Sequence, residues 1–197
     1  MPHGLLLVLL LCFCLAKAQA AEQWLYLFFP ADNDVQQSFV RINNRSDEAG
    51  ILTITGIDDE GVRSPNTVTL SFAAGQSRNF NSDDLENGNS SRGLTGALGE
   101  GTGNWRIKVT SSQTAKVLSL LEDPDGNISN LSTAIVPEND QYLINYMLPD
   151  DASQQGFIRF ISNSNSATTV SIEGIDEEGS SSNITLALGA NEGRHLN

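Results

Sequence analysis

The sequence is poor in the residues that most catalytic and metal sites require. It contains two cysteines and two histidines among 197 residues, and 24 acidic side chains outnumber 11 Lys and Arg. The net charge of −13 argues against a nucleic-acid binder, since such proteins neutralise phosphates with a basic surface. No apolar run reaches the roughly 18 residues that a membrane-spanning helix needs. We therefore expect neither a nucleic-acid partner nor a membrane span.

Both cysteines lie in an N-terminal segment with the pattern of a secretory signal. Residues 5–15 are apolar, and Ala18 and Ala20 are the small residues that precede a cleavage site. We expect residues 1–20 to be a cleaved signal peptide, which makes the mature protein secreted or surface-bound, with the periplasm as the alternative. Only His195 and no thiol would then remain, so nucleophilic catalysis by a Cys or Ser–His pair is disfavoured. We predict a protein that is not an enzyme.

The rest of the chain repeats itself with an offset of 118 residues. Residues 22–61 align with residues 140–179 without a gap, and this alignment ends with ITGIDDEG facing IEGIDEEG. After a two-residue deletion the match resumes and runs to the last residue, where RNFN faces RHLN. The second copy has no counterpart of residues 82–137. We therefore predict two tandem units, residues 21–137 and 138–197, of which the second is incomplete.

Apolar and polar residues alternate within each copy, which is the period of a half-buried strand. The predicted strands of the first copy are residues 24–29, 39–43, 51–57, 67–72, 76–80, 105–110, 116–121 and 128–133. Short strands with turns at regular spacing are typical of sandwiches. The prediction is an all-β fold of tandem antiparallel, immunoglobulin-like β-sandwich units, with one short helix at residues 83–86 capped by Ser82.

The same alternation predicts which strand positions face the core. The expected buried residues are Val40, Ile42, Leu52, Ile54, Leu70, Trp105, Ile107, Val109 and Leu118. A register slip by one residue would bury their alternate neighbours instead, because successive side chains point to opposite faces of a strand.

Two acidic segments carry the oxygen ligands that Ca²⁺ prefers. The candidate ligands are Asp58, Asp59 and Glu60 in the first segment, and Asp123, Asp125 and Asn127 in the second. Each segment also fits a turn, because the first ends in a glycine between two strands and the second contains Pro-Asp-Gly. Adjacent carboxylates in so short a turn point apart, so we expect turns with no metal or other cofactor, and calcium is the alternative.

An arginine recurs at equivalent strand positions of the two copies, as Arg41 and Arg159. Both have apolar neighbours, and the pattern predicts a structural salt bridge from each to an acid that faces it.

Three segments together resemble a known module. They are residues 39–50 (FVRINNRSDEAG), 80–89 (FNSDDLENGN) and 101–106 (GTGNWR). They are similar to a tandemly repeated, functionally uncharacterised module of secreted and surface proteins of proteobacteria, many of them marine. The resemblance covers the first copy and the first half of the second. It implies a bacterial exported protein and carries over no catalytic residue.

These observations favour a non-catalytic exported module with a structural or adhesive role. The alternative is an accessory polysaccharide-binding module of a larger secreted hydrolase, in which the aromatic residues Trp24, Tyr26, Phe28 and Phe29 would stack on sugars. The expected partners are neighbouring repeats, cell-surface proteins or polysaccharide.

The incomplete second copy leaves three arrangements open. The chain is a fragment of a longer array, which we favour, or the second copy packs on the first, or another molecule donates strands.

Overall fold

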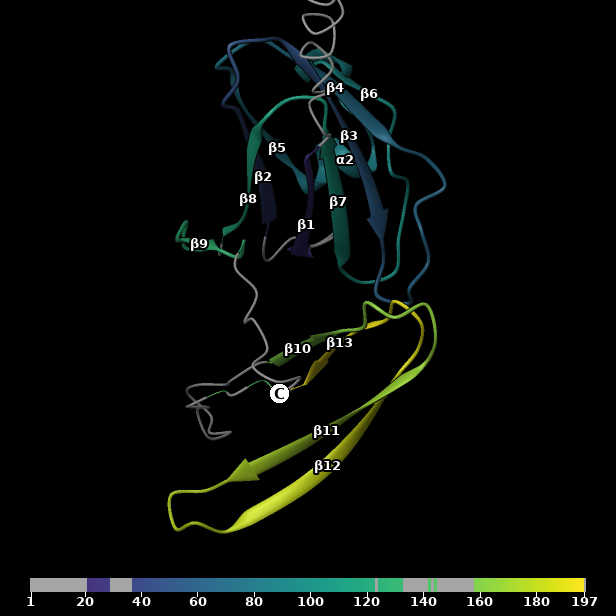
Figure 1. Cartoon of the computed structure of the whole chain (residues 1–197), viewed down its shortest axis with the longest axis vertical. Helices are drawn as coiled ribbons and strands as arrows, with labels where there is room; N and C mark the ends of the chain where they lie inside the picture. Colours follow the sequence, from purple (N-terminus) through teal and green to yellow (C-terminus); the bar gives the residue numbers. More distant parts are fainter. Residues whose placement is uncertain are drawn as a thin grey trace, which may run out of the picture.

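A computed structural model describes residues 21–28, 37–122, 124–132, 142, 144 and 158–196. The predicted signal peptide, residues 1–20, lies outside the described residues. Within them the chain is all-β with antiparallel sheets and one short α-helix, which confirms the predicted class. No helix in this described part is long and apolar enough to cross a membrane. We call residues 21–132 the first unit and residues 158–196 the second unit (Figure 1).

Two sheets form the first unit and face each other across a shared core (Figure 1). One sheet contains, in spatial order, β1 (Ala21–Phe28), β7 (Trp105–Ser111), β3 (Gly50–Ile57), β4 (Val68–Phe72) and β6 (Leu94–Thr95). The other contains β5 (Ser77–Asn81), β2 (Gln37–Asn44), β8 (Ala115–Glu122) and β9 (Ile128–Asn130). Each strand thus lies within a residue or a few of its predicted bounds, apart from β6, which sequence analysis missed.

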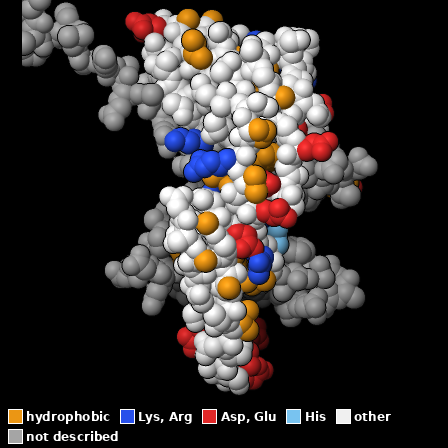
Figure 2. All heavy atoms as spheres, turned by 90° about the vertical axis from the view of Figure 1, so that its right-hand side faces the viewer, with side chains coloured by type: hydrophobic (Ala, Val, Ile, Leu, Met, Phe, Trp, Pro, Cys, Tyr) orange, Lys and Arg blue, Asp and Glu red, His pale blue; other side chains and the backbone are white. Residues whose placement is uncertain are grey.

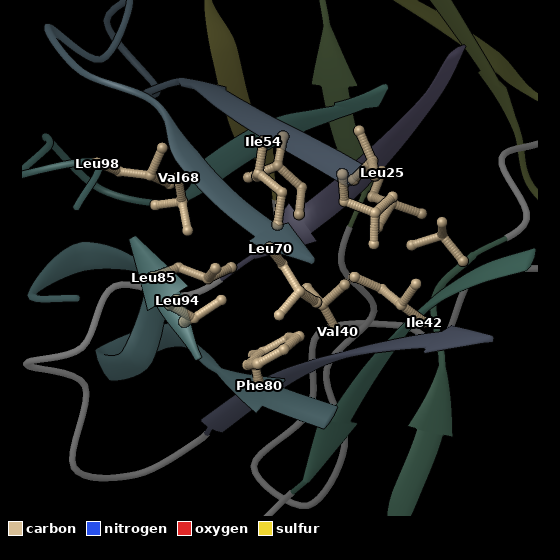
Figure 3. Packing of buried hydrophobic residues seen from close by; sticks show 14 of the residues in the cluster. Leu25, Val40, Ile42, Ile54, Val68, Leu70, Phe80, Leu85, Leu94 and Leu98 are labelled. Atoms are coloured by element: carbon tan, nitrogen blue, oxygen red, sulfur yellow. The ribbon is translucent and has the colours of Figure 1, made fainter. Parts of the chain in front are cut away.

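The core between the sheets consists mostly of side chains from alternate strand positions, with Leu85 of the helix at residues 82–86 and Leu98 of the loop before β7 added to them (Figure 3). Eight of the nine residues predicted to be buried are at most 2% exposed: Val40, Ile42, Leu52, Ile54, Leu70, Trp105, Ile107 and Val109. The ninth prediction, Leu118, is wrong, because Val117 and Ser119 point inward instead. The register of β8 explains this, since Ile42 of β2 lies opposite Val117, and the exposed Arg41 lies opposite Leu118.

The predicted short helix is α2 (Ser82–Glu86), and its cap is one residue earlier than predicted. Asn81, not Ser82, is the N-cap, and its side chain accepts a hydrogen bond from the backbone N–H of Asp84 at 2.9 Å. The Asp84 carboxylate accepts in turn from the N–H of Asn81 at 3.1 Å. This capping box satisfies two backbone donors at the start of the helix.

A glycine-rich connection, residues 96–103, leads from β6 to β7 and covers Trp105. A Cβ atom at Gly56 on β3 would lie 2.6 Å from the Trp105 ring, and one at Gly101 would also overlap it. The indole N–H donates to the buried carboxylate of Glu86 on α2. Two glycines and one helix thus fix the largest buried side chain of the unit.

The second unit contains four strands in two separate pairs. They are β10 (Ile158–Ile161) with β13 (Gly193–Leu196), and β11 (Thr168–Ile175) with β12 (Ser181–Leu188). Their registers match those of the first unit at the aligned positions. Ile158 lies opposite Leu196 where Val40 lies opposite Phe80, and the β11–β12 register reproduces that of β3–β4 through all five paired positions of β3.

Candidate functional site: the junction between the two units

The acidic turn of the first unit is a hairpin turn at the end that faces the second unit (Figure 1). The N–H of Asp58 donates to the carbonyl of Val62 at 2.9 Å, and Gly61 closes the turn with a φ of 82°. The Asp58 carboxylate, only 8% exposed, accepts from the N–H groups of Glu60, Val62 and Thr102 at 2.8 to 3.1 Å. Its oxygens hold the turn and the glycine-rich connection together.

Asp59 connects this turn to the second unit. Its Oδ1 forms an ion pair with Nη2 of Arg159 on β10, and its Oδ2 accepts from the N–H of Asn104 at 2.8 Å. Its carbonyl accepts from the N–H of Gly193 at 3.0 Å. The backbone and side chain of one residue therefore both bind the second unit.

Arg106, on β7, supplies the other half of the contact. Its guanidinium donates to the carbonyl of Ser162 at 2.7 Å and to the side-chain oxygens of Asn163 and Asn191 at 2.8 and 3.1 Å. Arg106 is 4% exposed, so these bonds form away from bulk water. The side chains of Asn104 and His195 also meet, with Nδ2 and Nε2 3.1 Å apart. We call the contacts of Asp59, Asn104 and Arg106 with the second unit the junction.

The turn that carries Asn191 has a counterpart in the first unit. Asn191 has a φ of 56°, and the aligned Gly75 has a φ of 65°. Each donates its N–H to a serine carbonyl of the preceding loop, Ser164 and Ser46 respectively. Glycine is the usual residue in this left-handed conformation, and asparagine tolerates it. The asparagine adds the side-chain oxygen that Arg106 uses, so this difference between the copies serves the junction.

The charged side chains of the ion pair in the junction are largely buried. The side chain of Arg159 is 7% exposed and that of Asp59 is 20% exposed. The Nε and Nη1 atoms of Arg159 are buried and have no hydrogen-bond partner among the described residues. A buried guanidinium of this kind depends on its counter-ion, because loss of the carboxylate leaves an uncompensated charge.

His195 lies at the edge of the junction. Partial burial and the neighbouring Arg159 guanidinium lower the pKa of its imidazole below 6.5, and Asp59 opposes this shift. Much of the ring still faces solvent, so the shift is moderated by screening. The neutral imidazole is the form that fits beside the arginine.

The candidate calcium ligands do not form a common site. Asp58 and Asp59 have the structural contacts described above, and Glu60 is exposed. Asp125 and Asn127 are exposed on either side of Gly126, whose φ of 81° marks a turn, and Asp123 lies outside the described residues. Across residues 21–28, 37–122, 124–132 and 158–196, no three acidic, His or Cys side chains are grouped so that they could hold a metal ion.

The prediction for the two arginines has two different outcomes. Arg159 forms the expected ion pair, but its acid lies in the other unit rather than on a neighbouring strand. Arg41 is exposed on β2, and no ion pair involves it among the residues that the structure describes. The aligned positions therefore have different surroundings.

The remaining junction residues were not foreseen from the sequence. Asn104, Arg106, Asn163 and Asn191 form no motif, and Arg106 has no counterpart in the second copy. The available signal was the difference between copies at otherwise matching positions, such as Asn191 for Gly75. The aromatic platform of the alternative hypothesis lies outside the described part of the chain, which excludes the side chains of Trp24, Tyr26 and Phe28 and all of Phe29.

No family model, curated protein or solved structure matches the chain significantly.

Proposed function

We propose that the protein is a non-catalytic, exported module of tandem β-sandwich units, and that its role is to hold consecutive units in a fixed arrangement within a structural or adhesive surface protein. The observation that carries this proposal is the junction. Two nearly buried arginines, Arg106 and Arg159, are committed to contacts between units. Buried, hydrogen-bonded guanidinium groups favour one geometry over others because any other arrangement leaves them unpaired.

The matching strand registers support a tandem repeat. The pairs β10–β13 and β11–β12 have the registers of β2–β5 and β3–β4 at every aligned position that both contain. Chance similarity of sequence would not require identical pairing, because register depends on each turn and each alternating face.

The strand neighbours support an immunoglobulin-like arrangement in part. The neighbours β2–β5 and β3–β7 correspond to the B–E and C–F neighbours of such sandwiches. Two strands differ from that arrangement. β1 pairs with β7, in the sheet where an immunoglobulin-like sandwich has its last strand, and β8 pairs with β2, in the sheet where it has its first strand. We infer a variant of the immunoglobulin-like sandwich with these two strands exchanged.

The test is the arrangement of the two units in solution. Small-angle scattering of the mature chain is expected to give one compact envelope, whereas Asp59→Ala is expected to broaden the distance distribution. Glu60→Ala is the matched control, since Glu60 is the exposed neighbour in the same turn. Unchanged scattering for Asp59→Ala would contradict the proposed role of the junction.

Export is tested separately. Expression of the complete chain in a proteobacterial host is expected to yield an extracytoplasmic protein whose N-terminus is Ala21. Retention of residues 1–20 in a cytoplasmic protein would contradict the proposed localisation.

A further inference from the structure

One edge of the β11–β12 pair has no partner strand among the described residues, although the aligned edge in the first unit is paired. β3 pairs with β4 on one side and with β7 on the other. β11 pairs with β12, and no strand of the described chain pairs with its other edge. Ile175 and Ile184 are 70% and 56% exposed, while the aligned Ile57 and Val68 are 2% and 0% exposed. Figure 2 shows hydrophobic side chains on the surface of this lower part of the molecule.

Gly56 of β3 shows which contact the unpaired edge of β11 lacks. Gly56 lies opposite Ile107 of β7, and the Trp105 ring packs over it so closely that a Cβ atom there would be 2.6 Å from the ring. Glycine inside a strand destabilises the strand relative to alanine, and it often marks a close approach. The close packing of Trp105 therefore explains why the first unit has a glycine at position 56.

The second unit has a glycine at the same position without the tryptophan. Gly174 aligns with Gly56, and it lies in β11 opposite Ser182 of β12. Among the described residues, a Cβ atom at Gly174 would meet only the Ser182 hydroxyl, at 3.7 Å. No described neighbour of this residue therefore requires glycine, and no described side chain fills the space that Trp105 fills in the first unit.

The charges along the edge indicate which strand would fit. Thr55 of β3 lies opposite Lys108 of β7, and the residue aligned with Thr55 is Glu173. A lysine at the same place on an incoming strand would therefore face a carboxylate, which is a favourable cross-strand pair. The hairpin tip adds the exposed acids Asp176, Glu177 and Glu178.

We propose that the free edge of β11 is an acceptor site for a β-strand of another polypeptide with the pattern Trp-x-Ile-Lys-Val, the pattern of β7. In the register of β3 and β7, the incoming isoleucine lies opposite Gly174 and the valine opposite Ile172. The tryptophan ring covers Gly174, and the lysine faces Glu173. Strand addition satisfies the free backbone groups of the edge, and the side-chain pockets give selectivity.

The experiment measures binding of a synthetic peptide, residues 104–112 (NWRIKVTSS), to the full mature chain by calorimetry at low salt. Binding of one peptide per chain is expected. Gly174→Val is expected to weaken it at least about tenfold, because the valine occupies the space of the tryptophan while suiting a free strand. The peptide with Trp105→Ala is expected to bind the wild-type chain about as weakly, and to be insensitive to Gly174→Val.

A second variant changes the charge pair between Glu173 and the incoming lysine. It keeps the inference testable if Gly174→Val fails to fold. Glu173→Lys is expected to weaken binding of the natural peptide, and the peptide with Lys108→Glu is expected to restore binding to this variant. Thr169→Lys, an exposed change at the far end of β11, is the matched control that adds the same charge away from this pair.

Two results would overturn the inference. The first is absence of peptide binding to the wild-type chain. The second is binding that neither Gly174→Val nor Glu173→Lys weakens, as strand exchange with β7 of the first unit would give. The inference goes beyond the proposed function. Its failure leaves the junction unaffected, since no junction residue is altered in this experiment.

Discussion

The two units have the same strand registers and very different degrees of burial. Ile54 lies opposite Val68 in the first unit, and Ile172 lies opposite Ile184 in the second. Val68 is fully buried, whereas Ile184 is 56% exposed. The register is thus set locally, by the alternating pattern and by turns with recurring hydrogen bonds, such as Asp58 to Val62 in the first unit and Asp176 to Ser180 in the second. Burial depends on two opposed sheets that share a core. The described part of the second unit contains only two two-stranded sheets, and its buried apolar side chains are those of Leu186 and Leu188.

The largest difference is expected from one substitution made in both units. Ile54→Ala removes a fully buried side chain and is expected to cost about 2–5 kcal/mol of unfolding free energy. Ile172→Ala alters a half-buried side chain, and we expect it to cost less than about 1 kcal/mol. Urea denaturation followed by tryptophan fluorescence and amide exchange measures both. Equal costs would contradict the difference in packing.

Removal of the junction carboxylate is expected to have the next largest effect. Asp59→Ala leaves the buried Arg159 without a counter-ion and is expected to destabilise the contact by about 3 kcal/mol. Glu177→Ala, the aligned change in the second unit, alters an exposed side chain and is expected to have little effect. Limited proteolysis between and within the units distinguishes the two variants. Equal proteolysis of both would count against the junction.

The aligned glycines provide a third comparison. Gly56→Ala forces a methyl group against Trp105 and is expected to cost about 1–3 kcal/mol by overpacking. Gly174→Ala meets no such contact in the described part of the chain and is expected to be neutral, or to stabilise its strand by a few tenths of a kcal/mol. Melting temperatures of the two variants measure this. A loss of stability in Gly174→Ala would show that β11 is covered in solution.

A smaller effect is expected from pH. Well above pH 6.5 His195 is neutral in both the folded and the unfolded chain. Because its pKa is lowered in the folded state, acidification below 6.5 protonates the unfolded chain first, and stability falls until the folded pKa is passed. The free energy of unfolding measured from pH 8 to pH 5 is expected to show this loss. His195→Asn, which introduces the residue of the aligned position 79, is expected to remove it.

Glu192 contributes in a lower pH range. Its carboxylate accepts from the N–H of Gly189 and is close to Arg194, and these contacts lower the pKa of Glu192 below 4.5. Its stabilisation is present above pH 4.5 and is lost as the pH falls through the folded value. Glu192→Gln keeps an acceptor, as Gln76 does for Ala73 in the aligned turn, and should flatten the profile only in this lower range.

The smallest effect is expected from calcium. Asp58 accepts three backbone hydrogen bonds and Asp59 pairs with an arginine, so neither has an oxygen directed at a common ion. We expect EDTA and millimolar Ca²⁺ to leave the melting temperature unchanged. A bound ion would add about 2.7 kcal/mol at a hundredfold excess over its Kd, and a shift of several degrees would therefore contradict the turn interpretation.

The strands and most of the core could be predicted from the sequence because alternation is a local property. Val40 and Ile42 face inward because β2 alternates, and the same rule misplaced Leu118 because the run LSLL offers two apolar faces. Only the pairing of Val117 with Ile42 decides between them. The contribution of Leu94 and Leu98 to the core was also missed, since their glycine-rich surroundings have no strand period.

The junction could not be predicted because it depends on how two distant segments meet. Arg159 was assigned a salt bridge from its position among apolar residues, but its partner Asp59 is 100 residues away and belongs to a turn. Arg106 has three acceptors in two loops of the second unit. Such contacts are set by the arrangement of the units, which no periodicity in the chain encodes.

Hydrogen exchange at aligned amides tests the central claim most directly. The claim is that strands with the same register are buried in a core in the first unit, whereas in the second unit they are held mainly by the contacts of the junction. We predict that amides of β3 and β4 exchange only on global unfolding, and that those of β11 and β12 exchange orders of magnitude faster. Asp59→Ala should accelerate exchange in β10 and β13 and leave β3 and β4 unchanged. Equal protection of the two hairpins, or equal acceleration of both units, would contradict the account.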